Sequence, residues 1–437
     1  MPIVDVANVQ QLVDAISDAQ PGDEIVLADG TYTLTGIACS SPGMASAPIT
    51  VRAANRRMAQ IRMDSVEGFR VTAPYWTFEG LDIEGVCATD DDCEHAFHVT
   101  GAAHHFVLRD SRVRDFNAQL KVNAAMVSGT MTAPDAGLIE GNDIGDTRGR
   151  NTANPVTKLN IDTGDDWIVR GNYLHDAQKL LDNRTSYVAF LKSGGKRGLV
   201  ERNLVICAKD DPTGGTRIGL SFGGGGTGNQ FCAPAYDASV PCATEHYDGV
   251  MRNNIIVNCS DVGIYLNESA NTKLLYNTLI ATAGIDFRFM TTTGEAVGNV
   301  LAGQIRTTRD QATGTKTNNL EMVPAAMFTS WYADPMNGDL SVIGDVSSLV
   351  AAGPARTDVV DDYCARTRPS STVTLGALEH SLGACATTMP PPGGDAGTGQ
   401  NDGATPSDSG GCCETGGGRS STFLATLVAI LALRRRP

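Results

Sequence analysis

The sequence predicts an all-β protein: a right-handed parallel β-helix with a short helix capping its N-terminal end. Three observations favour this fold. A motif of the form E/R-G/N-N/D-x-I/L recurs through the middle of the chain, the stretches between its copies are short and β-rich, and the 437 residues include 48 glycines. Recurrence at this scale indicates stacked supersecondary units, and frequent glycine suits a chain that turns several times per unit.

Each copy of the motif contributes one residue that we take as equivalent. These residues are Leu81, Asp110, Asn142, Asn172, Asn203, Asn254, Asn277 and Asn299, with successive spacings of 29, 32, 30, 31, 51, 23 and 22. Repeats built from two helices have periods above about thirty as well, but the sequence lacks the two amphipathic helices per unit. We therefore predict about ten coils of short strands, whose asparagine amides bond from coil to coil in a structural column.

The first residues predict the helical cap. Four apolar residues have helical spacing after the possible N-cap Asn8, namely Val9, Leu12, Val13 and Ile16. A solenoid leaves an open sheet edge and an uncovered core at its end, and a short helix there protects both.

The first coil and the last segment follow from local patterns. The stretch PGDEIVLADGTYTL places Ile25, Leu27 and Tyr32 on a strand, a turn and a second strand. Near the other end, DDYCARTRPSSTVTLGALEHS (361–381) predicts a terminal segment that folds back on the solenoid. We assign residues 1–386 to the β-helix, with an insertion at about 223–244.

The C-terminal residues change in composition. Residues 387–411 are rich in Pro, Gly, Ser and Asp, which predicts a disordered linker. Residues 412–437 contain two cysteines, an apolar run from Thr422 to Leu433 and three arginines, and the run is shorter than the roughly 20 residues of a membrane span. This tail resembles the C-terminal sorting tails of myxobacteria and their relatives, which implies attachment to the cell envelope; a simple hydrophobic anchor is the alternative.

Charge and cysteine content limit the partners and the compartment. The formal net charge of -15 makes nucleic acid an unfavourable partner. Eleven cysteines without a C-x-x-C pair indicate disulfides in an exported protein, although the first ten residues have no signal-peptide pattern and leave the route open. The expected clips are Cys87 with Cys93, Cys232 with Cys242, and Cys364 with Cys385, while Cys207 and Cys259 either pair between coils or stay buried thiols.

The stretch PGDEIVLADGTYTL, the following APITVRAAN (47–55) and the coil repeat resemble the start of polysaccharide lyases of the chondroitinase B and alginate lyase type. The resemblance covers residues 5 to 115, and the remaining coils share only the architecture. It implies a secreted, carbohydrate-active protein in which a Lys acts as base and an Arg on a neighbouring coil, with calcium, neutralises a uronate carboxylate. It supports the fold more than the activity.

Three basic residues are candidates for that chemistry. Lys192 ends a strand in VAFLKSGGKRG, Arg217 lies on the next coil in GGTRIGLSF, and Lys158 lies one coil earlier in VTKLNID. Matching positions in consecutive coils lie about 4.8 Å apart. We therefore predict a column of Lys158, Lys192 and Arg217, in which Lys192 and Arg217 are catalytic and Lys158 binds substrate.

The 51-residue interval predicts a loop that overhangs the same wall. It follows a run of four glycines, which permits close approach of backbone to a ligand. Glu245, His246 and Asp248 come directly after it. We predict that His246 is an acid or base and that Glu245 and Asp248 bind substrate; a structural histidine is the alternative.

Calcium is a further expectation from the resemblance. Those lyases hold calcium with Asn and Glu near the catalytic Lys, but TSYVAFLKSGG has no Glu there. The oxygen ligands available instead are Asp162, Asp165 and Asp166, or Asp182 with Asn183. Solvated acidic turns are the alternative.

Together these features predict a monomeric protein of the cell surface, anchored at its C-terminus, with a polysaccharide as its partner. The leading hypothesis is a lyase that cleaves an acidic polysaccharide by elimination. The alternatives are a glycoside hydrolase, which requires two facing carboxylates, and a non-catalytic glycan-binding or structural protein. The enzyme hypothesis requires Lys192, Arg217 and the residues from Glu245 to Asp248 to converge around one groove.

Overall fold

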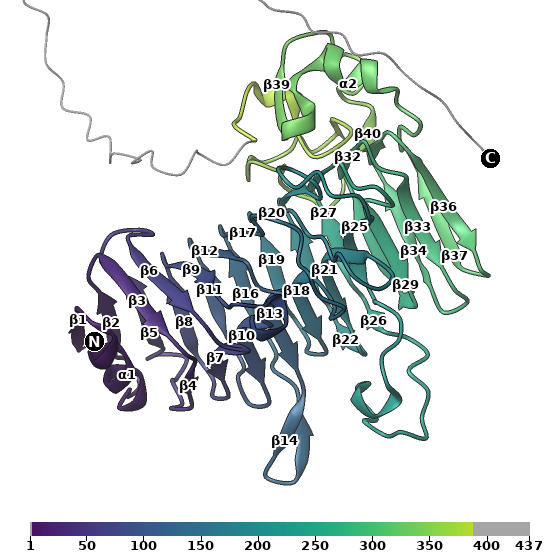
Figure 1. Cartoon of the computed structure of the whole chain (residues 1–437). Helices are drawn as coiled ribbons and strands as arrows, with labels where there is room; N and C mark the ends of the chain where they lie inside the picture. The colour runs from purple at the N-terminus through teal and green to yellow at the C-terminus, as the bar shows by residue number, and fades with distance from the viewer. Residues whose placement is uncertain (1, 388–437) are drawn as a thin grey trace, which may run out of the picture. The chain divides into compact units, whose positions relative to one another are not determined.

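Three long parallel sheets make up most of the computed structural model, which describes residues 2–387 (Figure 1). From β2 to β36, each coil contributes one strand to sheet 1, one to sheet 2 and one to sheet 3, in that order. Inward-facing apolar side chains from all coils form one continuous core from Val6 to Ala312. This is the predicted right-handed parallel β-helix.

The strands of each sheet succeed one another along the stack. Sheet 1 contains β1 (Ile3–Val6), β2 (Glu24–Leu27), β5 (Ile49–Ala53), β8 (Trp76–Glu79), β11 (Val107–Arg109), β16 (Leu138–Glu140), β19 (Ile168–Arg170), β23 (Leu199–Glu201), β27 (Val250–Arg252), β31 (Thr272–Leu275), β34 (Thr293–Val297) and β37 (Thr313–Thr317). Sheet 2 contains β3 (Gly30–Leu34), β6 (Ala59–Met63), β9 (Asp82–Gly85), β12 (Arg112–Arg114), β17 (Asp143–Gly145), β20 (Tyr173–His175), β24 (Leu204–Ile206), β28 (Ile255–Val257), β32 (Thr278–Ile280) and β35 (Val300–Leu301). Sheet 3 contains β4 (Ile37–Cys39), β7 (Glu67–Val71), β10 (His95–Thr100), β13 (Ala118–Asn123), β18 (Thr157–Asp162), β21 (Thr185–Lys192), β25 (Thr216–Phe222), β29 (Ile264–Asn267), β33 (Gly284–Arg288) and β36 (Gln304–Arg309).

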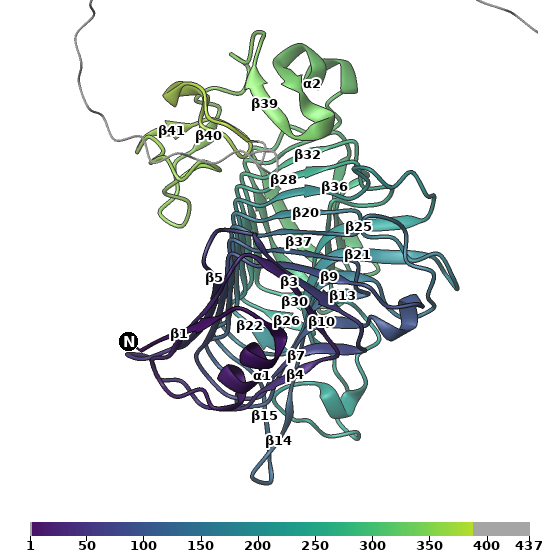
Figure 2. The same ribbon diagram turned by 60° about the vertical axis from the view of Figure 1, so that its left-hand side comes forward.

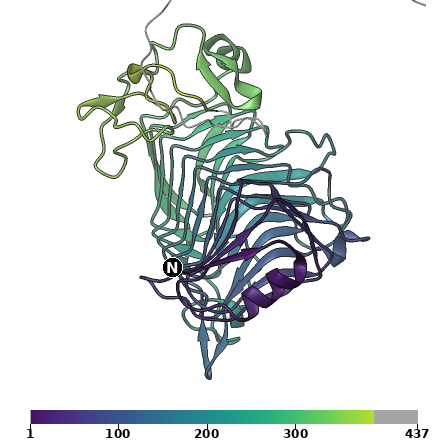
Figure 3. The same ribbon diagram turned by 90° about the vertical axis from the view of Figure 1, so that its left-hand side faces the viewer.

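The helix α1 (Val9–Ser17) confirms the predicted cap. The side chain of Asn8 accepts a hydrogen bond of 3.0 Å from a backbone N–H in the first turn, so Asn8 is the N-cap. Leu12 and Ile16 are buried, whereas Val13, which we expected on the same face, is 36% exposed. Figures 2 and 3 show α1 at the N-terminal end of the stack, where it covers the core.

The first coil also follows the prediction. Ile25 and Leu27 lie on β2, Tyr32 lies on β3, and all three side chains are buried. The Tyr32 hydroxyl lies 3.0 Å from the carbonyl oxygen of Val6 and 2.9 Å from that of Ala28. These contacts tie the first coil to β1.

A column of asparagines runs along the corner between sheet 1 and sheet 2. The side-chain amide of each member donates to the side-chain oxygen of the next at 2.8 to 3.0 Å, through Asn142, Asn172, Asn203, Asn254, Asn277, Asn299 and Asn319. The same oxygens accept the backbone N–H of the preceding asparagine. The predicted structural column is therefore confirmed, and it extends one coil further than predicted, to Asn319.

One member of the predicted column is wrong. The register pairs Arg109 with Glu140, which places Ser111 opposite Asn142. The Asn142 side-chain oxygen accepts the backbone N–H of Ser111 at 3.0 Å, and the Ser111 hydroxyl in turn accepts the backbone N–H of Leu81 at 3.1 Å. Asp110 instead occupies the corner position with a φ of 53°, where glycine is found in other coils.

Four disulfides occur within the described residues. They join Cys87 to Cys93, Cys207 to Cys259, Cys232 to Cys242 and Cys364 to Cys385. The three expected clips are confirmed, and of the two possibilities for Cys207 and Cys259 the structure shows the pair that links neighbouring coils. A disulfide content of this kind is typical of oxidising compartments.

Residues 321–387 pack against the outer side of the last sheet 2 strands (Figure 1). Their elements are α2 (Ala325–Trp331), the antiparallel pair β38 (Tyr332–Asp334) and β39 (Asp339–Val342), and the antiparallel pair β40 (Gly353–Pro354) and β41 (Thr372–Val373). Buried Arg368 donates to the side-chain oxygen of Asn253 at 3.0 Å, and Asp361 pairs with Arg202. The predicted fold-back of 361–381 is therefore confirmed.

Most of the predicted linker 387–411 and the whole predicted tail 412–437 lie outside the described residues. Among residues 2–387, no helix has the length and apolar character needed to cross a membrane.

The asparagine column yields a test of what stabilises the stack. Asn203→Ala removes a fully buried side chain that bonds to both neighbouring asparagines, leaving buried partners without hydrogen bonds. We expect the free energy of unfolding to fall by about 3 kcal/mol, measured by urea denaturation. Asn55→Ala, an exposed position, is the control. Equal losses for the two variants would refute a stabilising role for the column.

Candidate functional site

The two largest segments that project from the coils are both connections from sheet 3 to sheet 1. The antiparallel hairpin of β14 (Ala125–Val127) and β15 (Thr130–Thr132) follows β13. The predicted insertion follows β25 and contains a short 3-10 helix, Asn229–Phe231. Figures 1 and 2 show both projecting from the same side of the stack. They border the ends of the sheet 3 strands that lie between them.

Glu245 holds the glycine run of the insertion in place. Its buried carboxylate accepts the backbone N–H groups of Gly224 at 2.7 Å, Gly225 at 3.0 Å and Thr227 at 3.3 Å. Because three amides converge on one carboxylate, Glu245 positions the loop rather than a ligand. The predicted substrate-binding role of Glu245 is therefore replaced by a role in shaping the site.

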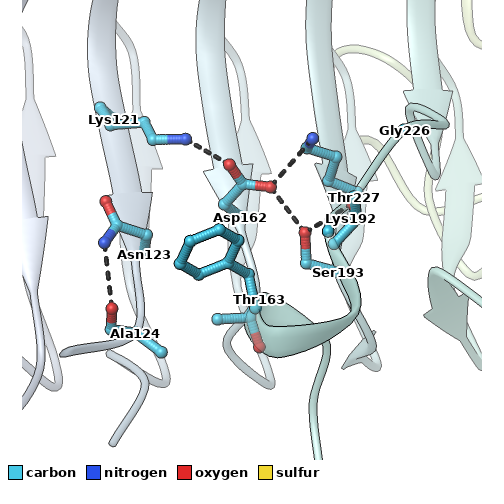
Figure 4. A pocket seen from close by; sticks show the side chains of 11 residues that line it. Lys121, Asn123, Ala124, Asp162, Thr163, Lys192, Ser193, Gly226 and Thr227 are labelled. Atoms are coloured by element: carbon cyan, nitrogen blue, oxygen red, sulfur yellow. Dashed lines mark hydrogen bonds and ion pairs between the residues drawn. The ribbon is translucent and has the colours of Figure 1, made fainter. Parts of the chain in front are cut away.

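A pocket of about 390 Å³ lies between sheet 3 and this loop (Figure 4). Lys121 on β13 and Lys192 on β21 both reach the carboxylate of Asp162 on β18, the strand between them; the Lys192 Nζ to Asp162 Oδ1 distance is 3.2 Å. The Ser193 hydroxyl donates to the same oxygen at 2.6 Å. The exposed ring of Phe231 from the insertion lines the opposite side.

The two ammonium groups control the ionisation of Asp162. Burial alone would raise the pKa of this carboxyl, but the charges of Lys121 and Lys192 outweigh burial and hold the pKa below its ordinary value. The charged carboxylate is shared, so this group of three side chains carries one excess positive charge. A chain of net charge -15 thus presents a local cationic site.

Several residues of this region were not predicted from the sequence. Lys121 is one of them, and His98 on β10 is another. The His98 ring lies 2.8 Å from Glu67 Oε1 through Nδ1 and 2.8 Å from Asn123 Oδ1 through Nε2. Asn123 lines the pocket, so these side chains extend the polar surface along sheet 3. An alignment of outward positions on consecutive sheet 3 strands was the signal that could have found them.

The predicted column of Lys158, Lys192 and Arg217 is wrong. Lys192 is paired in register with Asp162, and Arg217 is paired with Ser186, six residues before Lys192 on the same strand. Six residues of a strand span about 20 Å. The three basic residues therefore lie at different positions along their strands and do not form a column.

Both misplaced residues have internal partners. The Lys158 side chain is fully buried and paired with Asp146. Arg217 is 3% exposed, binds Gln178 at 2.9 Å and Asp211 at 3.0 Å, and borders a separate hollow formed with residues 208–215. Neither side chain lines the pocket at Lys192, because each is directed toward a buried carboxylate elsewhere.

His246 and Asp248 also lie away from the pocket. His246 is buried and stacks on Phe222 with ring centroids 4.1 Å apart, and neither ring nitrogen has a hydrogen-bond partner within the described residues. The predicted acid–base role of His246 is therefore wrong, because no ligand at the surface can reach its ring. Asp248 is exposed at a corner, where it accepts from the Asn271 side chain at 2.6 Å.

The predicted calcium ligands do not come together. Asp162 faces two lysines, whereas Asp165 and Asp166 pair with Arg197 at 3.1 and 2.7 Å. Asp182, the other candidate, pairs with Lys179 at 3.4 Å. Residues 2–387 contain no group of three or more acidic, histidine or cysteine side chains with a geometry for metal binding. The carboxylate of Asp162 is already held by two ammonium groups.

Of the residues whose convergence the enzyme hypothesis required, only Lys192 lines the pocket. Lys192 and the loop held by Glu245 share the pocket, but Arg217, His246 and Asp248 lie outside it. The site that the structure brings together is Lys121, Asp162 and Lys192.

Comparisons with known proteins point to one structural group. The chondroitinase B family model matches residues 6–118. No curated protein sequence matches the chain significantly. Pectate lyase Pel9A is similar in structure, with a TM-score of 0.53 and 15% identity over 84% of this chain and 90% of that chain. A rhamnogalacturonan lyase has a TM-score of 0.50 and 14% identity over 77% of this chain and 90% of that chain.

An alginate lyase from Paenibacillus sp. str. FPU-7 has 16% identity over 73% of this chain and 99% of its own, with a TM-score of 0.39. At these identities, the likeness to pectate lyase Pel9A and to the rhamnogalacturonan lyase establishes the parallel β-helix fold. The family match covers the N-terminal coils, before the strands that carry Asp162 and Lys192.

The burial of His246 yields a prediction on pH dependence. Burial lowers its pKa to about 3, so the folded protein keeps the ring neutral while the unfolded chain protonates it below about pH 6.5. The free energy of unfolding therefore decreases as the pH falls below about 6.5, by about 1.4 kcal/mol per pH unit. We expect His246→Phe to gain about 2 kcal/mol relative to the parent between pH 8 and pH 5, measured by chemical denaturation. A difference that does not change with pH would show that the ring is protonated in the folded state.

Proposed function

We propose that this protein is a polysaccharide lyase-type β-helix protein that binds an acidic polysaccharide at the pocket of Lys121, Asp162 and Lys192 and cleaves it by β-elimination. The carrying observation is the convergence of two lysines, from strands on either side of β18, on a single carboxylate in an open pocket. A uronate carboxylate can accept the N–H groups of these two ammonium groups that Asp162 does not use. The basic pocket of an acidic protein then selects an anionic glycan.

The proposed reaction uses the two lysines differently. Lys121 binds the uronate carboxylate and neutralises the charge that develops on it. Lys192 first loses its ammonium proton to solvent, and the resulting amine removes the proton from the carbon next to that carboxylate. The electron pair forms a carbon–carbon double bond, and the bond to the glycosidic oxygen of the adjacent carbon breaks. That oxygen takes a proton from water, and the hydroxide formed takes back the proton that Lys192 removed. The products are a new chain end and an unsaturated uronate.

The lining of the pocket supports elimination over hydrolysis. A hydrolase needs two carboxyl groups flanking the scissile bond, roughly 5 to 9.5 Å apart. Among the described residues, Asp162 is the one carboxylate that lines this pocket. Both of its oxygens are engaged by lysines and Ser193, which leaves it unsuited to act as a general acid.

Non-catalytic glycan binding is the second candidate function. It is favoured by the position of Arg217, since the arginine predicted to assist the lysine is buried beside Asp211 instead. Under this proposal the same cationic pocket retains the glycan without cleaving it.

Compartment, assembly and calcium remain proposals as well. Four disulfides and the sequence of the C-terminal tail support an exported protein attached to the cell surface, which surface proteolysis of intact cells would test. A monomer, to be checked by light scattering, suits the proposed use of one sheet face. Calcium binding away from Asp162 is tested by titration calorimetry.

The elimination proposal is tested with alginate, chondroitin, dermatan and pectin while the ultraviolet absorbance of the unsaturated uronate is recorded. We expect a rise with at least one of them, and Lys192→Ala should slow it by about 10² to 10⁴-fold because the base is lost. Lys196→Ala is the matched control, since the Lys196 side chain lies over the Tyr247 ring outside the pocket.

Each outcome separates the candidates. Glycan binding without any absorbance rise would reject elimination and support the non-catalytic function. An absorbance rise that survives in Lys192→Ala would place the base elsewhere. Loss of the rise in Lys196→Ala as well would show that the substitutions act through folding.

A further inference from the structure

A second group of charged residues lies on the outward face of sheet 3. Buried Asp286 on β33 is paired with Arg306 at 3.0 Å and with Arg309. Arg288 pairs with Asp310 at 2.6 Å and donates to the Tyr265 hydroxyl at 3.1 Å. The three arginine side chains are 33 to 43% exposed and face two carboxylates, so this group also has one excess positive charge.

This arginine group is aligned with the lysine pocket. One outward column of paired residues crosses sheet 3 through Arg70, His98, Lys121, Asn160, Phe190, Ser221, Tyr265, Asp286 and Arg306. Figure 1 shows the strands that carry it, from β13 to β36, in one row. Four strand spacings separate β18 from β33, which corresponds to about 19 Å. The lysine pocket and the arginine group are therefore two separate charged groups on the outward face of sheet 3.

The two charged groups have similar arrangements of ion pairs. In each, one carboxylate is held between two cations: Asp162 between Lys121 and Lys192 from different strands, and Asp286 between Arg306 and Arg309, both from β36. The outward positions between them include the rings of Phe190 and Tyr265. Around Tyr265, the side chains of Tyr187, Ile218 and Val262 form an apolar cluster. Guanidinium groups bind carboxylates through paired hydrogen bonds.

We infer that Arg288, Arg306 and Arg309 form a second subsite for the acidic polysaccharide, whose chain runs along the outward face of sheet 3, parallel to the axis of the stack. The inference rests on the proposed binding of an acidic glycan at Lys121 and Lys192. A polysaccharide chain must span about 19 Å to contact both charged groups. Long oligosaccharides therefore use both subsites, and a disaccharide uses one.

The test is the double variant Arg288→Gln with Arg309→Gln, which leaves buried Asp286 paired with Arg306. The matched control is Arg109→Gln with Arg170→Gln, two sheet 1 arginines in ion pairs with side-chain exposures of 44 and 33%, against 43 and 33% for Arg309 and Arg288. Both doubles are made in a Lys192→Ala parent, so that no chain is cleaved during the measurement. Thermal unfolding checks that all variants fold.

Binding is measured by titration calorimetry with hexasaccharides and disaccharides of mannuronate and of galacturonate. We expect the arginine double variant to bind a hexasaccharide about tenfold more weakly than the parent, with disaccharide binding unchanged and the control equal to the parent. Unchanged hexasaccharide binding, or an equal loss for both lengths, would overturn the second subsite while the lysine pocket stands. If the protein with Lys192 intact neither bound nor cleaved any of these glycans, the proposed function and this inference would be overturned together.

Discussion

The asparagine column is the interaction on which the rest of the structure depends. Each asparagine bonds through its side-chain oxygen to both the backbone and the side chain of its neighbour, so every coil is held in one register from Asn142 to Asn319. A shift by one residue would turn every inward side chain of the strand outward. Each of these side-chain amides also donates to a backbone carbonyl oxygen of a preceding coil, so the column links the side chains to the backbone in one register.

Register in turn creates the charged groups on sheet 3. Lys121, Asp162 and Lys192 belong to three successive coils and lie tens of residues apart in the chain, yet they meet because their strands are neighbours. The same rule brings Asp286 to Arg306. The excess of acidic residues in the chain is therefore compatible with a cationic face, since net charge says nothing about where the charges gather.

The loops between sheet 3 and sheet 1 can vary in length without disturbing the stack. The hairpin of β14 and β15 and the insertion after β25 both use this freedom. The carboxylate of Glu245 holds the start of the insertion, and the disulfide of Cys232 with Cys242 closes a loop within it. A rigid scaffold with variable loops at one edge is where binding sites are usually found. The pocket lies at that edge, between sheet 3 and the insertion whose glycine run is bound by Glu245.

The sequence by itself determined the β-helix, the capping helix, the disulfide clips and six of the seven column asparagines, because each depends on local spacing or on one residue per coil. It missed the alignment of Ser111, since a hydroxyl replaces an amide there, and it misplaced Lys158, Arg217 and His246. Only the tertiary structure decided those positions. The strands of sheet 3 differ in length and the connections before them differ too, so the distance from a column asparagine to a side chain on sheet 3 is not constant, and convergence cannot be counted along the chain.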